Sequence, residues 1–233
     1  MKYSATHLLI QGEENLKNYN EWIINSFLRY VTVTNKTQVL DFGAGIGTLS
    51  KIWFDKTGLR PHCVEIDPDQ RAFIEKSGFK TYNAIDDTRE KYDIIFTSNV
   101  LEHIKDDVKT LSNIRPKLVS SGVLIIFVPA LEIIWSSMDV QVGHHRRYKR
   151  ASLLNKLEST GYKVQHIQYC DSAGFILSFL FKYIGSSNGE PSPISLRFFD
   201  NIILPVSKAL DTIACGKFGK NILAIATPNN SLE

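Results

Sequence analysis

The stretch Val39-Leu-Asp-Phe-Gly-Ala-Gly-Ile-Gly-Thr48 decides how this chain folds. An apolar run ends in Asp41, three glycines follow at alternate positions, and apolar residues at helical spacing come next. This order predicts a buried strand, a tight turn and a helix N-terminus, which is how open α/β sheets hold nucleotide-like ligands at their carboxyl edge. Glycine suits such a turn because it adopts positive φ and lets ligand atoms approach bare main chain.

The glycine spacing limits the class of ligand. A dinucleotide-binding fingerprint has a glycine or alanine three residues after its second glycine, and Thr48 stands at that position here. The pattern Asp-x-Gly-x-Gly-x-Gly instead resembles motif I of the class I S-adenosylmethionine-dependent methyltransferases. A purely structural turn is the alternative, and the segments that follow argue against it.

Three further segments occur in the order of that family. His62–Pro68 predicts a short buried strand that ends in Glu65, and Tyr92–Ile104 contains a strand followed by Ser-Asn-Val-Leu-Glu-His. Ser121–Pro129 is an uninterrupted apolar run, as in parallel strands that helices cover on both faces. Together with the glycine segment, the resemblance covers about residues 37–130.

The alternation of apolar runs and helical patterns predicts a single α/β domain over residues 1–233. Strands are expected over 37–42, 60–66, 79–84, 92–97, 121–128, 163–170 and 221–227. Helices are expected over 14–31, 46–57, 69–77, 106–118 and 150–160. The resemblance implies a doubly wound, seven-stranded, mostly parallel sheet of order 3-2-1-4-5-7-6, with helices on both faces and an antiparallel last strand.

Composition agrees with one compact cytoplasmic domain. The chain has 233 residues, of which 43% are hydrophobic, so it can bury a full core. Its three cysteines lie far apart and predict reduced thiols rather than disulfides or a zinc site. The first residues carry no charged-then-apolar leader pattern, so secretion is not expected. The net charge of +3 is too small to indicate a nucleic-acid partner.

An apolar insertion over 172–219 is expected between the sixth and seventh strands. A polar break over 185–193 divides it into two expected helices. Loops this long often act as lids, and the apolar run over 173–181 is too short to span a bilayer. It could therefore form a lid over an apolar pocket, a peripheral surface that dips into a membrane, or additional core.

The resemblance implies a cofactor site for S-adenosylmethionine. The residues expected to form it are Asp41, Gly43, Gly45, Gly47, Glu65, Ala84, Ile85, Asp86, Asn99 and Tyr19. The glycines would cradle the methionine portion and Asp41 would bind its amino group through water. Glu65 would accept from both ribose hydroxyls, and the segment 84–86 would border the adenine. Asn99 would face the methionine, and Tyr19 could cover its carboxylate end.

A second motif, Asp139-Val-Gln-Val-Gly-His-His-Arg-Arg-Tyr148, follows the fifth expected strand. This Gly-His-x-Arg-Arg-Tyr segment resembles that of a bacterial subgroup of methyltransferases (Methyltransf_11/12-like). It lies at the strand edge where open α/β sheets place substrate contacts. The expected substrate-binding residues are Arg146, Arg147 and Tyr148. One arginine could clamp a carboxylate or phosphate while the other pairs with Asp139 or Glu102, or both could belong to a solvated basic turn.

Three histidines are candidates for a general base, since histidine titrates near neutral pH. His103 follows the fourth expected strand, and His144 and His145 lie on the loop after the fifth. Any one of them could take a proton from a hydroxyl or ammonium acceptor, and each could instead be structural. No metal is expected, because Asp106 and Asp107 start a helix rather than form a carboxylate cluster.

Two functions are consistent with these features. The first is methyl transfer by in-line displacement to a small-molecule, lipid or lipid-linked glycan acceptor. The Ser98-Asn-Val-Leu segment argues against exocyclic-amine methylation of nucleic acid, which uses an Asn/Asp-Pro-Pro-aromatic tetrad there. The second is a non-catalytic module that binds the cofactor and docks a partner through the surface 173–204. Oligomeric state is not indicated by the sequence.

Overall fold

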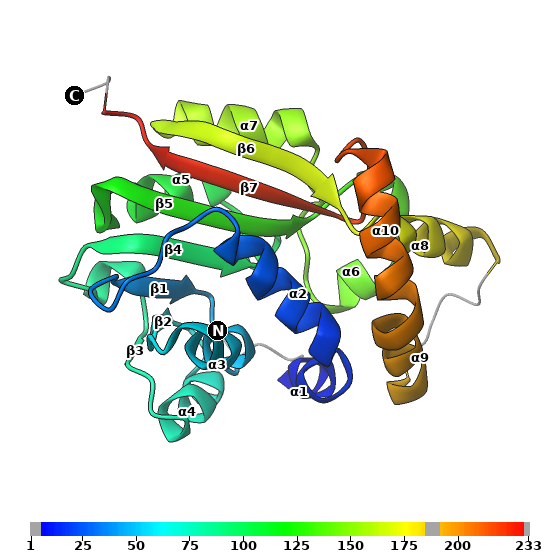
Figure 1. Ribbon diagram of the computed structural model, residues 1–233, viewed down its shortest axis with the longest axis horizontal. Helices are drawn as coiled ribbons and strands as arrows, with labels where there is room; N and C mark the ends of the chain where they lie inside the picture. Colours follow the sequence, from blue (N-terminus) through cyan, green and yellow to red (C-terminus); the bar gives the residue numbers. More distant parts are fainter. Residues whose placement is uncertain (1–5, 185–191, 231–233) are drawn as a thin grey trace.

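The computed structural model describes residues 6–184 and 192–230, and within them seven strands form one sheet. They are β1 (Val39–Phe42), β2 (His62–Val64), β3 (Thr81–Tyr82), β4 (Tyr92–Ser98), β5 (Leu118–Pro129), β6 (Tyr162–Cys170) and β7 (Asn221–Pro228). The spatial order is β3-β2-β1-β4-β5-β7-β6 (Figure 1). Only β7 runs antiparallel to its neighbours. The expected fold class, strand order and antiparallel last strand are confirmed.

The helices expected from the sequence are present, and two more, over Thr6–Asn15 and Ser137–Gln141, were not expected. The helices are α1 (Thr6–Asn15), α2 (Lys17–Leu28), α3 (Thr48–Thr57), α4 (Pro68–Lys76), α5 (Asp107–Ile114), α6 (Ser137–Gln141), α7 (Arg150–Ser159), α8 (Ser172–Ile184), α9 (Pro193–Phe198) and α10 (Leu204–Ala214). Short 3-10 turns are η1 (Ile85–Asp87), η2 (Leu101–His103), η3 (Arg115–Lys117) and η4 (Glu132–Ile134), and η5 (Phe199–Ile203) is a π-helical turn.

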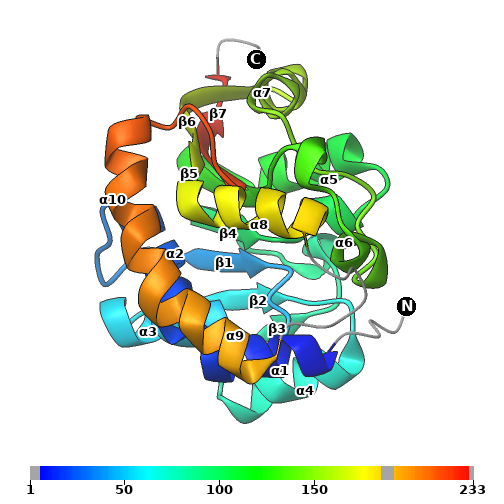
Figure 2. The same cartoon turned by 90° about the vertical axis from the view of Figure 1, so that its right-hand side faces the viewer.

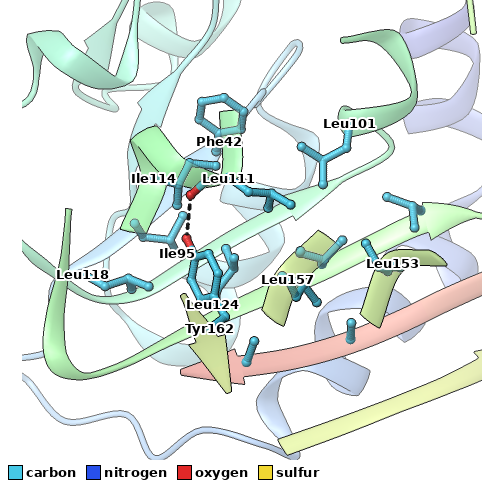
Figure 3. Close-up of a cluster of buried hydrophobic side chains, with 14 of the residues drawn as sticks. Phe42, Ile95, Leu101, Leu111, Ile114, Leu118, Leu124, Leu153, Leu157 and Tyr162 are labelled. Atoms are coloured by element: carbon cyan, nitrogen blue, oxygen red, sulfur yellow. Dashed lines mark hydrogen bonds between the residues drawn. The ribbon is translucent and has the colours of Figure 1, made fainter. Parts of the chain in front are cut away.

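Helices cover both faces of the sheet, which explains the uninterrupted apolar character of the central strands. Leu111 and Ile114 of α5 are fully buried on one face, where the Tyr162 hydroxyl donates to the Leu111 carbonyl at 3.0 Å (Figure 3). Phe27 of α2 and Trp53 of α3 are fully buried on the other face. The two hydrophobic layers hold the carboxyl ends of β1, β4 and β5 at one common edge.

Two helix boundaries differ from expectation for local reasons. The leading helix is α2, and a further helix, α1, precedes it over residues that read as polar and mixed. The helix expected over 106–118 ends at Ile114, because Pro116 removes a main-chain donor and the chain continues as the short turn η3. Strand β5 therefore begins at Leu118.

The connection between β6 and β7 is helical. α8 follows β6 directly, and α9, η5 and α10 form one nearly continuous helix along the side of the molecule (Figure 2). Most of the expected polar break, residues 185–191, lies outside the described residues. Among the described helices, none combines the length and apolar character that a membrane span requires.

Asp200, within η5, connects this segment to the start of α2. Its carboxylate oxygens accept from the amides of Asn18 and Tyr19 at 3.0 and 2.8 Å. These amides have no acceptor inside α2 because they belong to its first turn. Asp200 is 4% exposed, so the bonds are shielded from water. A side chain far away in the sequence thus caps the leading helix.

We expect Asp200→Ala to lower the free energy of unfolding by about 1–2 kcal/mol, the usual cost of losing a helix cap. Urea denaturation followed by circular dichroism measures this change. Asp55→Ala, at an exposed aspartate of α3, is the matched control and should change stability little. Equal stability of the Asp200 and Asp55 variants would show that the cap contributes nothing.

Candidate active site

The glycine loop, residues 43–47, is bound to the neighbouring strand through its main chain. The amides of Gly43 and Ala44 both donate to the carbonyl of Val64, the last residue of β2, at 2.8 and 3.1 Å. Gly43 has a φ of +80°, and a Cβ built there would overlap the side chain of Val100. Backbone conformation and close neighbours therefore both exclude a side chain at this position.

Helix α1 lies against the same loop, which the sequence did not indicate. Gly45 has a φ of +58°, and a Cβ there would lie 3.2 Å from Cδ1 of Leu9 in α1. Nε2 of Gln70 in α4 donates to Oγ1 of Thr6 at 3.0 Å. Gly47, with a φ of +84°, is the N-cap residue of α3. The loop is thus bordered by α1 in addition to the strands.

Glu65 follows β2, and its carboxylate faces the glycine loop. Oε2 accepts from the amide of Gly45 at 2.8 Å, and Oε1 accepts from the amide of Asp67 at 2.9 Å. Burial raises the pKa of Glu65, and the amide hydrogen bonds oppose this shift in part. Asp67 caps α4 by accepting from the amides of Asp69 and Gln70. The structure therefore places Glu65 next to the loop.

Asp41 lies behind the loop and is 2% exposed. Its Oδ2 accepts from Oγ of Ser50 in α3 at 2.7 Å. Burial raises the pKa of Asp41 to about 7, and the nearby Glu65 adds to the shift, whereas the Ser50 hydrogen bond opposes it. Asp41 thus supports the start of α3, and its water-mediated contact with a ligand stays a prediction.

The segment expected to border a base lies after β3. The amide of Ala84 donates to Oδ2 of Asp87 at 3.0 Å, and Asp86 is exposed. Ile85 is 6% exposed and packs in the core, so its main chain is left for the expected contact, which stays a prediction. Ile66, directly after the β2 acid, is 59% exposed. It is an additional candidate to contact the adenine. The only sign of this in the sequence is that an apolar residue stands in a polar turn.

Asn99 and Tyr19 lie on different parts of the carboxyl edge. Asn99 follows β4 with a φ of 53°, its amide donates to the carbonyl of Phe127 at 2.8 Å, and its side chain is exposed. The Tyr19 hydroxyl accepts from Nδ2 of Asn221, the first residue of β7, at 2.9 Å. Since β4 and β5 separate β1 from β7, the Tyr19 hydroxyl lies away from the glycine loop. The expected contact of Tyr19 with the cofactor stays a prediction.

The three histidines lie on two loops at the carboxyl edge. His103 ends η2, and His144 and His145 lie in the loop after α6. The His145 amide donates to the carbonyl of Glu102 at 2.7 Å and so joins the two loops. The rings of His103 and His144 meet edge to face, with centroids 4.6 Å apart, whereas the His145 side chain is exposed. The structure brings two of the histidines together and leaves the third on the surface.

Both arginines of the second motif are engaged with buried acids. Nε and Nη2 of Arg147 donate to Asp139 at 2.8 and 3.1 Å. Nη1 of Arg146 lies 2.7 Å from Oδ2 of Asp107. Tyr148 is 2% exposed, and its hydroxyl donates to Asp107 at 2.7 Å. The expectation that Tyr148 contacts a substrate is wrong because its side chain is part of the core, and the two guanidinium groups are held in internal pairs.

Burial and hydrogen bonding shift three pKa values around these histidines. Burial raises the pKa of Glu102 to about 8, although the charge of Arg147 opposes the shift. Burial and the adjacent His144 lower the pKa of His103 to about 4. Burial would raise the pKa of Asp139, but hydrogen bonds from His144 and Arg147 outweigh it and hold that pKa well below its usual range. At neutral pH, His103 is therefore uncharged and Asp139 is a carboxylate.

Comparison with known proteins agrees with this arrangement. Residues 17–167 match a family model described as a methyltransferase domain (Methyltransf_23). No curated protein matches the chain. Among solved structures, an S-adenosylmethionine-dependent methyltransferase from Archaeoglobus fulgidus is 17% identical with a TM-score of 0.62, covering 95% of this chain and 99% of that chain.

Two further structures illustrate the range of similar proteins. A methyltransferase from Haloferax volcanii, solved in complex with the Trm112 methyltransferase activator, is 13% identical with a TM-score of 0.66, covering 98% of this chain and 99% of that chain. Phosphoethanolamine N-methyltransferase 2 from Haemonchus contortus, solved with S-adenosyl-L-methionine, is 16% identical with a TM-score of 0.58, covering 90% of this chain and 52% of that chain.

At such identities the solved structures establish a shared fold, whereas the family model covers well over half of the chain and carries the family assignment. The motif I pattern, the strand order and the position of Glu65 all agree with that assignment. This protein belongs to the methyltransferase domain family.

Proposed function

We propose that the protein transfers the methyl group of S-adenosylmethionine to a small-molecule or lipid-like acceptor, which includes lipid-linked glycans. The contact between Glu65 and Gly45 is the observation that carries this proposal. It joins a carboxylate to bare main chain at the ends of two adjacent strands, where open α/β sheets bind adenosine-containing ligands. Family membership supplies the reaction class.

The residues at this edge fit the cofactor. The glycines of the loop put no side chain between the main chain and a ligand, and the amides of Gly43 and Gly45 hold the loop in place by donating to Val64 and Glu65. Glu65 offers two carboxylate oxygens to the hydroxyls of a ribose, and the exposed Ile66 offers apolar surface to a base. When bound, the cofactor supplies an electrophilic methyl group that an acceptor atom attacks in line.

The residues of the chain orient the acceptor and remove its proton. Holding two reactants in place can supply roughly 7–11 kcal/mol of the barrier reduction. His103 is a weak base because its pKa is about 4, and Nδ1 of His144 is engaged 2.7 Å from Asp139. His145 is exposed and is anchored at the edge through its amide. It is therefore the best candidate to take a proton from an acceptor hydroxyl or ammonium.

A groove between α8 and α10 supports a lipid-like acceptor. It has a volume of about 220 Å³ and is lined by Ala173, Ile176, Leu177, Leu180, Ile203, Val206 and Leu210. Ile194 and Phe198 of α9 are 80% and 56% exposed. α8 starts where β6 ends, so this apolar surface begins at the same edge of the sheet as the glycine loop.

The same apolar surface also fits the second function expected from the sequence, a non-catalytic module that docks a partner through residues 173–204. Both functions need cofactor binding. Methyl transfer to an added acceptor separates them, since a docking module would bind the cofactor without consuming it.

We expect Gly45→Val and Glu65→Ala each to weaken binding of S-adenosylmethionine and of its demethylated product at least tenfold. The valine conflicts with a φ of +58° and with Leu9, and the alanine removes a charged hydrogen-bond acceptor. Isothermal titration calorimetry measures both affinities. Glu158→Ala, at an exposed acid of α7, is the control. If both site variants bind like the wild type, the cofactor site is assigned wrongly.

The raised pKa of Asp41 gives a pH-dependent prediction. An acid whose pKa is about 7 when folded and 3.8 when unfolded stabilises the fold at low pH, and this stability is lost as pH rises through 7. Relative to Asp41→Asn, the wild type should lose up to about 3 kcal/mol between pH 5 and pH 8. Urea denaturation of the unliganded protein tests this. The exposed-site control Asp55→Asn should track the wild type, and a pH-independent difference for Asp41→Asn contradicts the assignment.

We expect the wild type to partition onto phosphatidylcholine vesicles and the double variant Ile194→Ser/Phe198→Ser to do so about tenfold less, because each exposed apolar side chain favours transfer from water. Co-sedimentation measures the bound fraction. The matched control is Val140→Ser/Val108→Ser, which removes exposed apolar side chains from other helices. Membrane contact by α9 is wrong if the wild type stays in solution or if both double variants bind alike.

A further inference from the structure

Lys220 directly precedes β7 at the carboxyl edge of the sheet, and both neighbouring strands fix its main chain there. The amide of Ala130, directly after β5, donates to the Lys220 carbonyl at 2.8 Å. The Lys220 amide donates to the carbonyl of Asp171, directly after β6, at 3.1 Å. Since β4 and β5 lie between β1 and β7, Lys220 is separated from the glycine loop. It therefore lies at the part of the edge that the proposed cofactor site does not use.

The ammonium group of Lys220 has no anion bound to it by the chain. Its Nζ lies over the ring of Phe199, 5.4 Å from the ring centroid. Within residues 6–184 and 192–230, Nζ makes no hydrogen bond or ion pair. The side chain is half-buried, and an ammonium that loses water without gaining an acceptor is destabilised. The three N–H donors of this group are therefore available to a ligand.

The acids closest to this ammonium are engaged by other groups. Asp139 accepts from Nε and Nη2 of Arg147 at 2.8 and 3.1 Å. Oδ1 of Asp171 accepts from Oγ of Ser207 at 2.7 Å. Burial lowers the pKa of Lys220, and the charge of Arg147 adds to this shift, whereas the charges of Asp171 and Asp139 oppose it. An anion bound at Nζ would favour the charged form of the lysine.

The contacts of Lys220 lie next to both walls of the apolar groove between α8 and α10. Asp171 is two residues before Ala173, the first groove residue of α8. Phe199 is four residues before Ile203, the first groove residue on the opposite wall. The positive charge and the apolar groove are therefore neighbours in the fold. A molecule with an anionic group and an apolar chain matches this combination.

We propose that Lys220 binds the anionic group, a carboxylate or a phosphate, of an acceptor whose apolar part lies in the groove between α8 and α10. A lysine ammonium binds such groups as a point charge with three donors. The inference rests on the proposed function in naming the chemical class of the acceptor, an anionic amphiphile. Lys220 is a specificity-determining residue in this proposal and takes no part in the chemistry of methyl transfer.

The test uses the full-length protein without cofactor and three probes, namely monomeric octyl phosphate, octanol and inorganic phosphate. We expect isothermal titration calorimetry to show that octyl phosphate binds at least tenfold more tightly than either of the other two. Octanol lacks the anionic group, and inorganic phosphate lacks the apolar chain. Lys220→Met keeps an apolar stem and removes the charge, so it should weaken octyl phosphate binding about tenfold and leave octanol binding unchanged.

Lys217→Met, at an exposed lysine of the same connection, is the matched control and should bind octyl phosphate like the wild type. Circular dichroism checks that Lys220→Met folds, as expected when an apolar side chain replaces a charge without an ionic partner. The proposal is overturned if octyl phosphate and octanol bind the wild type alike, or if Lys220→Met keeps full affinity for octyl phosphate. It is also overturned if Lys217→Met loses as much affinity, or if inorganic phosphate binds as tightly as octyl phosphate.

Calorimetry of the wild type with S-adenosylmethionine separates this result from the fate of the proposed function. Binding of S-adenosylmethionine without binding of octyl phosphate removes the Lys220 site and leaves the cofactor site intact. Binding of octyl phosphate that depends on Lys220, without binding of S-adenosylmethionine, supports the anion site and contradicts the proposed function.

Discussion

The attachment of the glycine loop to β2 is the constraint on which the rest of the site depends. The Val64 carbonyl accepts two amides of the loop, and Glu65, the next residue, accepts a third at Gly45. These bonds are available only because β1 and β2 are parallel neighbours with their ends in register. A side chain on Gly43 would collide with Val100, so the loop has little room to rearrange. Strand order, register and glycine content together fix one conformation.

The continuous apolar pattern was sufficient to predict the central strands, and the glycine spacing was sufficient to predict the loop that follows β1. It was insufficient wherever a partner comes from a distant segment. α1 is polar in pattern and is located through contacts such as that between Leu9 and Gly45. Tyr148 and Tyr19 look like site residues in sequence, but their hydroxyls bind Asp107 and Asn221. Periodicity cannot reveal such pairings.

The basic motif after β5 shows that charged side chains which look available in the sequence can form internal ion pairs in the fold. The sequence suggests that one of the two arginines pairs with an acid and leaves the other for a ligand, yet Arg146 and Arg147 are both held by acids buried elsewhere at the edge. Asp107 also binds Lys156, so this acid anchors two cations and the Tyr148 hydroxyl. These buried contacts support the loop that carries the histidines, which explains how the histidine rings keep defined positions at the surface.

The segment that joins β6 to β7 is an integral part of the fold. Asp200 caps α2, and Nε of Arg197 donates to Oδ1 of Asn15 at the end of α1 at 2.8 Å. Trimming this connection to a short turn would leave the first amides of α2 exposed and release α1 from its anchor beside Gly45. A shortened version of this protein would therefore need a redesigned leading segment. The connection between β6 and β7 and the helix beside the glycine loop are therefore parts of one structural unit.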